Sequence, residues 1–243
     1  KNKNVVLYID EFTRYLDVNL GKDAIDLLCG LGYSVRLYFG DSGRTFISKG
    51  FLKQAKNLAN KNITVLYKYA SQGTPIVGLE PSAILTFRDE YKRFHFETTE
   101  VETIAAASFL IEEFISGEIK RGNISKEQFT KSPATIKIHN HCHQKALSDQ
   151  KVTFDILNLP ENYKVSIISS GCCGMAGSFG YEQEHYNTSM QIGELKLFPS
   201  IRKSDEDVII SANGTSCRHQ IYDGTGRKAL HPVTILKKAL YID

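Results

Sequence analysis

Four of the five cysteines lie in three short polar islands, and each island follows an apolar run of strand length. The islands are His139–His143 around Cys142, Gly171–Gly174 around Cys172 and Cys173, and Ser216–His219 around Cys217. The preceding runs are Ile136–His139, Tyr163–Ile168 and Val208–Ser211. Because the carboxyl ends of adjacent parallel strands meet at one edge of a sheet, we expect these thiols to converge on one crevice.

The rest of the chain alternates between strand and helix patterns. Predicted strands in the first half are Val5–Ile9, Tyr33–Tyr38 and Pro75–Leu79, and helical spacing marks Lys22–Leu31, Phe51–Tyr69 and Ser82–Tyr91. An apolar run from Ile104 to Phe114 also reads as a helix. In the second half, a helical segment follows Gly174 as far as Phe198, and a last helix covers His231–Leu240. This alternation predicts an α/β fold.

The two halves read as one duplicated unit. Thirty positions separate Cys142 from Cys172, and the same number separates Glu11 from Asp41. The positions that carry cysteine in the second half are Glu11, Asp41, Ser42 and Ala83 in the first. We therefore predict two pseudo-repeated units, each a small, mostly parallel sheet flanked by helices. The expected boundaries are 1–96 for a first repeat that has lost its cysteines, 97–133 for a helical connector and 134–243 for the repeat with the cysteine site.

Bulk properties exclude several classes of protein. The chain has 243 residues, 42% of them hydrophobic, so it can bury a sizeable core. A formal net charge of +3 gives no support for nucleic-acid binding. No run approaches the roughly 20 apolar residues of a membrane-spanning helix. The odd cysteine count favours a reducing compartment, so we expect a cytoplasmic location. The chain begins at Lys1 without Met, and we expect a fragment of a longer protein.

The residues beside the cysteines favour bound metal. Thiolates bind metal, and four of them would satisfy either a 4Fe–4S cluster or tetrahedral zinc. A thiol–disulfide site at Cys172–Cys173 is the other chemistry open to these residues. Gly171 and Gly174 flank the vicinal pair and permit close backbone approaches.

Four charged or polar neighbours are candidates for the surroundings of the centre: His141, His143, Arg218 and His219. The histidines are read either as ligands and donors or as ordinary loop polarity. Arg218 either stabilises a thiolate or makes a surface ion pair. Cys29 lies in an apolar helical run and is expected in the core.

Three segments carry a family resemblance: Gly171–Glu182 (GCCGMAGSFGYE), His141–Gln144 (HCHQ) and Ser216–Ile221 (SCRHQI). They resemble the cysteine-rich CCG domain, which occurs in a subunit of heterodisulfide reductase and in iron–sulfur subunits of anaerobic glycerol-3-phosphate dehydrogenase, glycolate oxidase and lactate-utilisation complexes. The likeness is nearest to the carboxy-terminal part of FAD-linked oxidases of the lactate/glycolate dehydrogenase type. Ile9–Thr13 and Gly78–Ser82 in the first half share it.

The resemblance implies an iron–sulfur electron-transfer domain of an FAD-dependent oxidoreductase. Its 4Fe–4S cluster would be held by Cys142, Cys172, Cys173 and Cys217. The expected partners are an FAD-binding oxidase domain or subunit and a membrane quinone-linked acceptor, which adds peripheral association with the inner membrane face as an option. Many relatives carry a further cysteine where this chain has Gly214, and cysteines in the first repeat where it has Asp41, Ser42 and Ala83, so at most one cluster is expected. A zinc-binding structural or assembly domain and a thiol–disulfide redox domain remain the alternatives.

Overall fold

The computed structural model describes residues 3–94 and 99–241. The chain divides into two compact units, Lys1–Gly117 (unit 1) and Glu118–Asp243 (unit 2). Each unit has its own four-stranded sheet, and all the strand pairs within each sheet are parallel. The predicted fold class, two pseudo-repeated α/β units, is confirmed.

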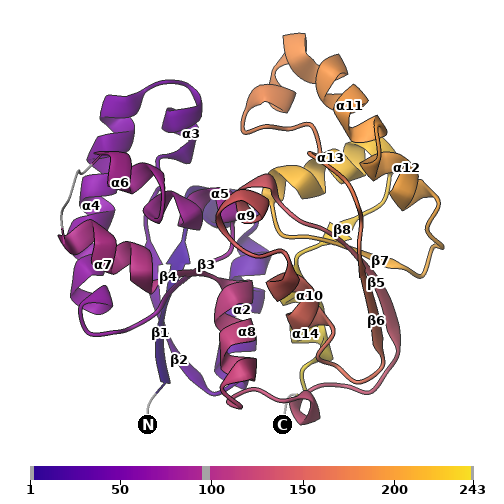
Figure 1. Cartoon of the computed structure of the whole chain (residues 1–243), viewed down its shortest axis with the longest axis horizontal. Helices are drawn as coiled ribbons and strands as arrows, with labels where there is room; N and C mark the ends of the chain where they lie inside the picture. Colours follow the sequence, from indigo (N-terminus) through magenta and orange to yellow (C-terminus); the bar gives the residue numbers. More distant parts are fainter. Residues whose placement is uncertain (1–2, 95–98, 242–243) are drawn as a thin grey trace. The chain divides into compact units, whose positions relative to one another are not determined.

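Unit 1 has the strand order β2-β1-β3-β4. Its elements are β1 (Lys3–Ile9), α1 (Glu11–Tyr15), α2 (Val18–Gly30), β2 (Tyr33–Phe39), α3 (Arg44–Ser48), α4 (Leu52–Ala70), β3 (Ile76–Gly78), α5 (Pro81–Ile84), the 3-10 turn η1 (Leu85–Phe87), α6 (Glu90–Phe94), α7 (Thr99–Ala107), β4 (Ser108–Leu110) and α8 (Ile111–Lys120), which crosses the unit boundary. The order reverses beside β1, so right-handed crossovers put α2 on one face and α4 and α7 on the other (Figure 1).

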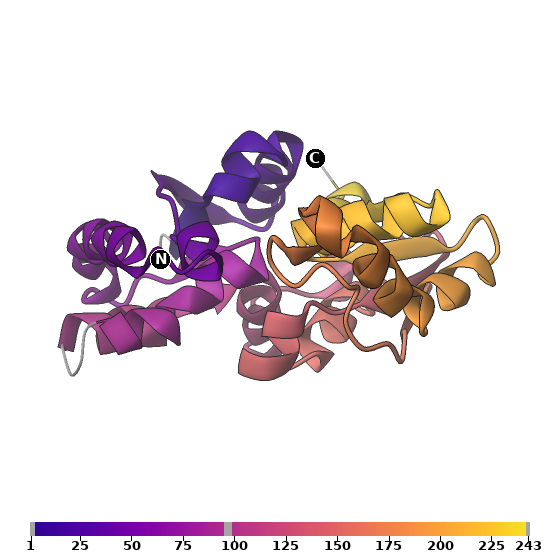
Figure 2. The same ribbon diagram turned by 90° about the horizontal axis from the view of Figure 1, so that it is seen from above.

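Unit 2 repeats this topology with the order β6-β5-β7-β8. Its elements are η2 (Lys126–Gln128), β5 (Ala134–His139), α9 (Cys142–Leu147), α10 (Lys151–Leu157), β6 (Tyr163–Ile167), η3 (Phe179–Tyr181), η4 (Gln183–His185), α11 (Tyr186–Glu194), α12 (Leu197–Arg202), β7 (Ile209–Ala212), α13 (Thr215–Thr225), β8 (Ala229–Leu230) and α14 (Pro232–Ala239). Helices α9 and α10 lie on one side of these strands and α11 and α12 on the other (Figure 2).

The core of unit 2 reaches the cysteines. Cys173 and Cys217 are 3% and 1% exposed and belong to one apolar cluster with Met175 and Phe198, among others. The ring of Phe198 packs directly against Gly193 on α11 and Gly224 on α13. A Cβ at these two positions would lie 2.2 and 2.3 Å from the ring, so neither has room for a side chain. Helices α11, α12 and α13 therefore pack closely around Phe198 beneath the cysteine loops.

Two short strands and one cysteine differ from the sequence expectations. Within the segment 97–133, the apolar run read as a single helix is broken by β4, which pairs with β3. Strand β8 of unit 2 has only two residues and was not predicted. The expectation for Cys29 was wrong, because this thiol is exposed on α2. The predicted boundaries at residues 96 and 133 stay a prediction.

Asp10 caps helix α1 from a buried position and should make the stability of the chain depend on pH. One carboxylate oxygen accepts the backbone N–H groups of Phe12 and Thr13 at 2.8 and 2.9 Å. Burial raises the pKa of Asp10 from its ordinary value of 3.8 to about 7, against the effect of the Thr13 backbone hydrogen bond. The folded chain therefore binds this proton more tightly than the unfolded chain, so stability falls as pH rises between the two values.

The change Asp10→Asn should flatten this dependence. Asparagine keeps an acceptor for the cap and cannot ionise, so the variant avoids the cost of a buried charge. A pKa difference of this size corresponds to about 4 kcal/mol between pH 4 and pH 8, gained by the variant relative to the parent chain. Urea unfolding of both chains at several pH values measures it. Parallel stability curves would contradict this account of Asp10.

Candidate metal centre

The four thiols of the site follow the carboxyl ends of three strands of unit 2. Cys142 is the first residue of α9 after β5, Cys172 and Cys173 lie in the loop after β6, and Cys217 lies in the first turn of α13 after β7. These strands are neighbours in the sheet, and the strand order reverses between β5 and β7. Such a reversal opens a crevice at the carboxyl ends of the strands. The topology therefore brings cysteines 75 residues apart to one edge.

The thiols form a continuous chain of contacts. Cys173 donates to Cys217 across 3.4 Å between the Sγ atoms. Cys172 is hydrogen-bonded to both Cys142 and Cys173. Cys142 and Cys172 are half-buried, whereas Cys173 and Cys217 are buried, so the chain runs from the surface into the core.

The four thiols differ in how readily they lose a proton. The pKa of Cys172 is held well below its ordinary value, first by hydrogen bonds from Cys142 and Cys173 and further by the backbone N–H groups of Gly174 and Ala176. The pKa of Cys217 is also lowered, by the hydrogen bond from Cys173 and then by His139, although burial opposes this. Hydrogen bonding to Cys172 raises the pKa of Cys142, and hydrogen bonding to Cys172 and Cys217 raises that of Cys173, whose single proton is shared between these two neighbours. Two sulfurs are therefore ready to be thiolates, the form that binds metal.

The loop around the vicinal pair depends on one of its two flanking glycines. Gly174 has φ +106, and a Cβ there would lie 2.1 Å from the carbonyl oxygen of Ser189. Its backbone N–H donates to Cys172 Sγ at 3.2 Å. Gly171 was expected to have the same role, but it has no positive φ, and a Cβ there would meet no described atom within 4 Å beyond its chain neighbours. Of the two, Gly174 alone meets the expectation of a close backbone approach.

His139 joins the thiols, although its sequence context did not single it out. It is the last residue of β5 and has no exposed surface. One ring nitrogen of His139 and the Sγ atoms of Cys173 and Cys217 lie within 4.8 Å of one another. Its position at the end of the strand before Cys142 was the available signal. This buried imidazole adds a nitrogen donor to four sulfur donors, a set that fits a thiophilic metal.

His141 has its proton state set by the backbone. It caps α9, where the N–H of His143 donates to His141 Nδ1 at 3.1 Å. Because a backbone N–H only donates, Nδ1 carries no proton, and the neutral ring carries it on Nε2. The ring is buried against Gly214, where a Cβ would lie 2.3 Å from Cδ2. The N–H at Nε2 makes His141 a hydrogen-bond donor beside the cysteine site, and a protonated His141 lowers the pKa of the nearby Cys217.

The remaining candidates lie on other contacts. His143 stacks on His141 with ring centroids 5.3 Å apart. Nδ1 of His219 lies 2.8 Å from the hydroxyl of Tyr181. Arg218 donates to the carbonyl oxygens of Ala212 and Asn213 at 3.0 and 2.8 Å, just after β7. Through these hydrogen bonds, Arg218 stabilises the backbone that leads into α13.

Lys145 and a pocket flank the exposed end of the thiol chain. Lys145 Nζ donates to the carbonyl oxygens of Ser170 and Gly171 at 2.9 and 2.8 Å, which ties α9 to the cysteine loop. A pocket of about 400 Å³ opens beside Cys172, between this loop and the segment Ile192–Leu197. Cys172 is thus the thiol that a small molecule in this pocket reaches.

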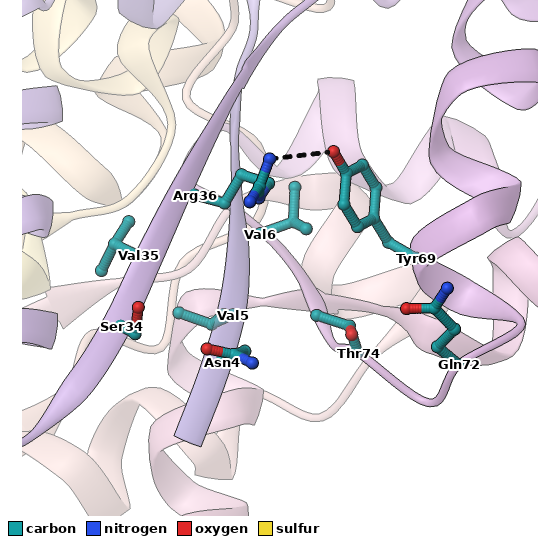
Figure 3. A pocket seen from close by; sticks show the side chains of 9 residues that line it. All are labelled: Asn4, Val5, Val6, Ser34, Val35, Arg36, Tyr69, Gln72 and Thr74. Carbon is teal, nitrogen blue, oxygen red and sulfur yellow. Dashed lines mark hydrogen bonds between the residues drawn. The ribbon is translucent and has the colours of Figure 1, made fainter. Parts of the chain in front are cut away.

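A second pocket lies in unit 1, beside the amino-terminal ends of β1 and β2. Figure 3 shows it beside Asn4 on β1 and Arg36 on β2, where Arg36 Nη1 donates to the hydroxyl of Tyr69 at 3.5 Å. It measures about 370 Å³. No cysteine or histidine is among the described residues that line it. This pocket offers no thiophilic ligand from those residues.

At the carboxyl ends of the unit 1 strands, carboxylate, hydroxyl and carbonyl oxygens form a hydrogen-bonded network at the positions equivalent to the thiols. Glu11 begins α1 as Cys142 begins α9, and its carboxylate accepts both the N–H and the hydroxyl of Ser42 at 2.7 Å. Tyr91 then donates to the carbonyl oxygen of Ser42 at 3.0 Å. Gly43 follows with φ +79, as Gly174 follows Cys173 with a positive φ. The same backbone thus supports a hydrogen-bonded network in place of thiols.

Comparisons with known proteins connect this chain to dehydrogenases. No protein-family model matches it. It is 29% identical over 242 residues to a D-2-hydroxyglutarate dehydrogenase of Pseudomonas putida, and 30% identical over 239 residues to one of Escherichia coli; each match covers 97% of this chain and 22% of the relative. It is 27% identical over 234 residues to a subunit of the anaerobic glycerol-3-phosphate dehydrogenase of Escherichia coli, covering 94% of this chain and 57% of that protein. The chain thus spans about a fifth of the length of the two D-2-hydroxyglutarate dehydrogenases and a little over half of the glycerol-3-phosphate dehydrogenase subunit.

Proposed function

We propose that unit 2 holds an iron–sulfur centre on Cys142, Cys172, Cys173 and Cys217, and that this centre relays electrons within a dehydrogenase. The observation that carries the proposal is the chain of four thiols at one sheet edge, two of them favoured as thiolates. Four thiolates are the usual complement of a 4Fe–4S cluster. The relationship to dehydrogenases supports a redox role, and the Gly171–Gly174 sequence is consistent with the CCG domain.

The surrounding residues suit this task. Backbone N–H groups of Gly174 and Ala176 point at Cys172 Sγ, and such donors stabilise sulfur-borne negative charge and raise the reduction potential of an iron–sulfur centre. The apolar cluster around Cys173 and Cys217 excludes water from the inner thiols. A bound iron–sulfur centre supplies one-electron chemistry, while the chain itself holds the ligands and tunes their charge.

The relatives and the resemblance to the CCG domain support a proposal for partners and substrate. We infer that electrons come from an FAD-binding domain or subunit that oxidises a small hydroxylated substrate, a 2-hydroxy acid or glycerol 3-phosphate. The pocket beside Cys172 offers a place for an acceptor close to the exposed sulfur. In the described part of the chain, every helix is too short or too polar to cross a bilayer. We propose a membrane quinone-linked carrier as the next acceptor.

One distance favours a second candidate, a structural zinc site. Tetrahedral zinc with bonds of about 2.3 Å puts its thiolates about 3.8 Å apart. The Cys173–Cys217 distance of 3.4 Å is close to that value. In this alternative the thiols and His139 would stabilise unit 2 for assembly with partner domains and would carry no electrons.

A redox cycle distinguishes the candidates. We expect the anaerobically prepared chain to show a broad visible band that dithionite bleaches and ferricyanide restores, because an iron–sulfur centre exchanges electrons reversibly. A zinc site would give no band. A thiol–disulfide site would also be colourless, and free-thiol titration would fall by two when Cys172 and Cys173 are oxidised. Either colourless result would contradict the electron-relay proposal.

A further inference from the structure

His139 is the most deeply placed polar group at the candidate centre. It has no exposed surface, and its Nε2 lacks an oxygen or nitrogen hydrogen-bond partner among the residues that the structure describes. The ring faces sulfur instead, since one ring nitrogen and the Sγ atoms of Cys173 and Cys217 lie within 4.8 Å of one another. A thiol is a weak partner, and a buried imidazole nitrogen without a strong one is unfavourable unless something else binds it. The arrangement therefore calls for an additional group between these three side chains.

The other ring nitrogen is already held. Nδ1 of His139 lies 2.9 Å from the hydroxyl of Ser170, in the loop that carries Cys172 and Cys173. Histidines that bind metal through one nitrogen almost always donate the other N–H to an oxygen, which fixes the tautomer and the ring orientation. The hydroxyl of Ser170 can accept a hydrogen bond from Nδ1–H, and in that tautomer the lone pair is on Nε2, where it is available to a metal held by the thiols.

We propose that His139 is a ligand of the centre through Nε2, alongside Cys173 and Cys217. This inference rests on the proposed metal binding of unit 2, and it makes the centre one of mixed nitrogen and sulfur ligation. Cys172 completes the inner set, because it is the chain neighbour of Cys173 and is hydrogen-bonded to it. Cys142, half-buried and hydrogen-bonded to Cys172, is then a neighbour of the ligand set and not one of its four members, in place of the ligand role it has in the all-cysteine centre.

His141 does not compete for this role. Its Nδ1 accepts the backbone N–H of His143, so Nε2 carries the proton. Binding metal through Nε2 would require that proton to leave a ring whose other nitrogen stays engaged. His139 has a hydroxyl partner that accepts or donates, so its ring can present a lone pair from Nε2.

The test labels the histidines of the whole chain with ¹⁵N and follows nitrogen coupling to the reduced centre by pulsed electron paramagnetic resonance. We expect a strong nitrogen coupling in the parent chain. His139→Cys should keep the metal, because a thiolate replaces the imidazole, but should lose the coupling and shift the reduction potential downward, because it adds negative charge. His139→Gln should lower metal occupancy at least about tenfold. His219→Gln is the matched control and should keep the coupling, since its ring pairs with Tyr181.

The outcomes separate this inference from the proposed function. Iron and sulfide present without a ligand-strength nitrogen coupling would overturn the role of His139 and leave the electron relay standing. Zinc with a nitrogen shell near 2.0–2.1 Å beside sulfur near 2.3 Å, seen by X-ray absorption, would support His139 and overturn the relay. A coupling that survives in His139→Cys would also overturn the inference, because another histidine would supply it.

Discussion

Replacing Cys173 with serine is expected to strip the chain of nearly all its bound metal. Cys173 is the central thiol, in contact with both Cys172 and Cys217, and it is 3% exposed. Loss of a supporting residue around a metal ligand typically costs about 10–100-fold in affinity, so loss of this buried ligand should cost more than about 100-fold. Serine would also bury a hydroxyl in an apolar cluster.

The matched control is Cys29→Ser. Cys29 is an exposed thiol on α2 of unit 1, and its replacement changes the cysteine count equally and leaves every residue of unit 2 unchanged. Metal content after anaerobic loading and gel filtration measures both variants. We expect the control to match the parent chain. A Cys173→Ser chain with undiminished metal would show that the vicinal pair does not hold the centre.

The second large effect is expected from Gly174→Ala. A methyl group there would lie 2.1 Å from the Ser189 carbonyl oxygen, and φ +106 is strained for any residue with a side chain. The strain and the forced movement of α11 together should cost about 3–5 kcal/mol. The shift would also move the N–H that points at Cys172 Sγ. We therefore expect lower metal occupancy together with lower stability.

Gly171→Ala gives the matched comparison on the other side of the same cysteine pair. The site has room for a methyl group and an ordinary φ, so the change should stay within about 0.5 kcal/mol. Hydrogen exchange of β5 amides reports on unit 2 alone and measures both variants. Equal protection in the two variants would contradict the role assigned to Gly174.

The sequence was informative where local pattern and topology agree. Apolar runs of strand length ended at polar islands, so β5, β6 and β7 could be predicted, and the geometry of parallel sheets then brought their cysteines together. Strand β4 was missed because its three residues lie within an apolar run that also has helical spacing. Strand β8 has two residues, too few for any periodicity to develop. Strands β4 and β8 form because they pair with a neighbouring strand, and the local sequence pattern contains no signal for that pairing.

The site itself was only partly predictable. Cysteines are conspicuous in a sequence, whereas His139 reads as the end of a strand, and its significance comes from Ser170 and Cys217, far away in the chain. Conversely, adjacency in sequence suggested that His219 faces the thiols, but the turn of α13 directs it to Tyr181. The position of a residue around the axis of α13 therefore decides whether a sequence neighbour of Cys217 also lies beside the thiols.

The most direct test of the metal centre is the content of iron, acid-labile sulfide and zinc per chain after anaerobic purification. We expect iron and sulfide in equal amounts, about four of each per chain for a 4Fe–4S cluster, and little zinc. One zinc per chain without sulfide would contradict the electron relay. A chain that takes up neither iron nor zinc, even after reconstitution, would contradict the metal centre altogether.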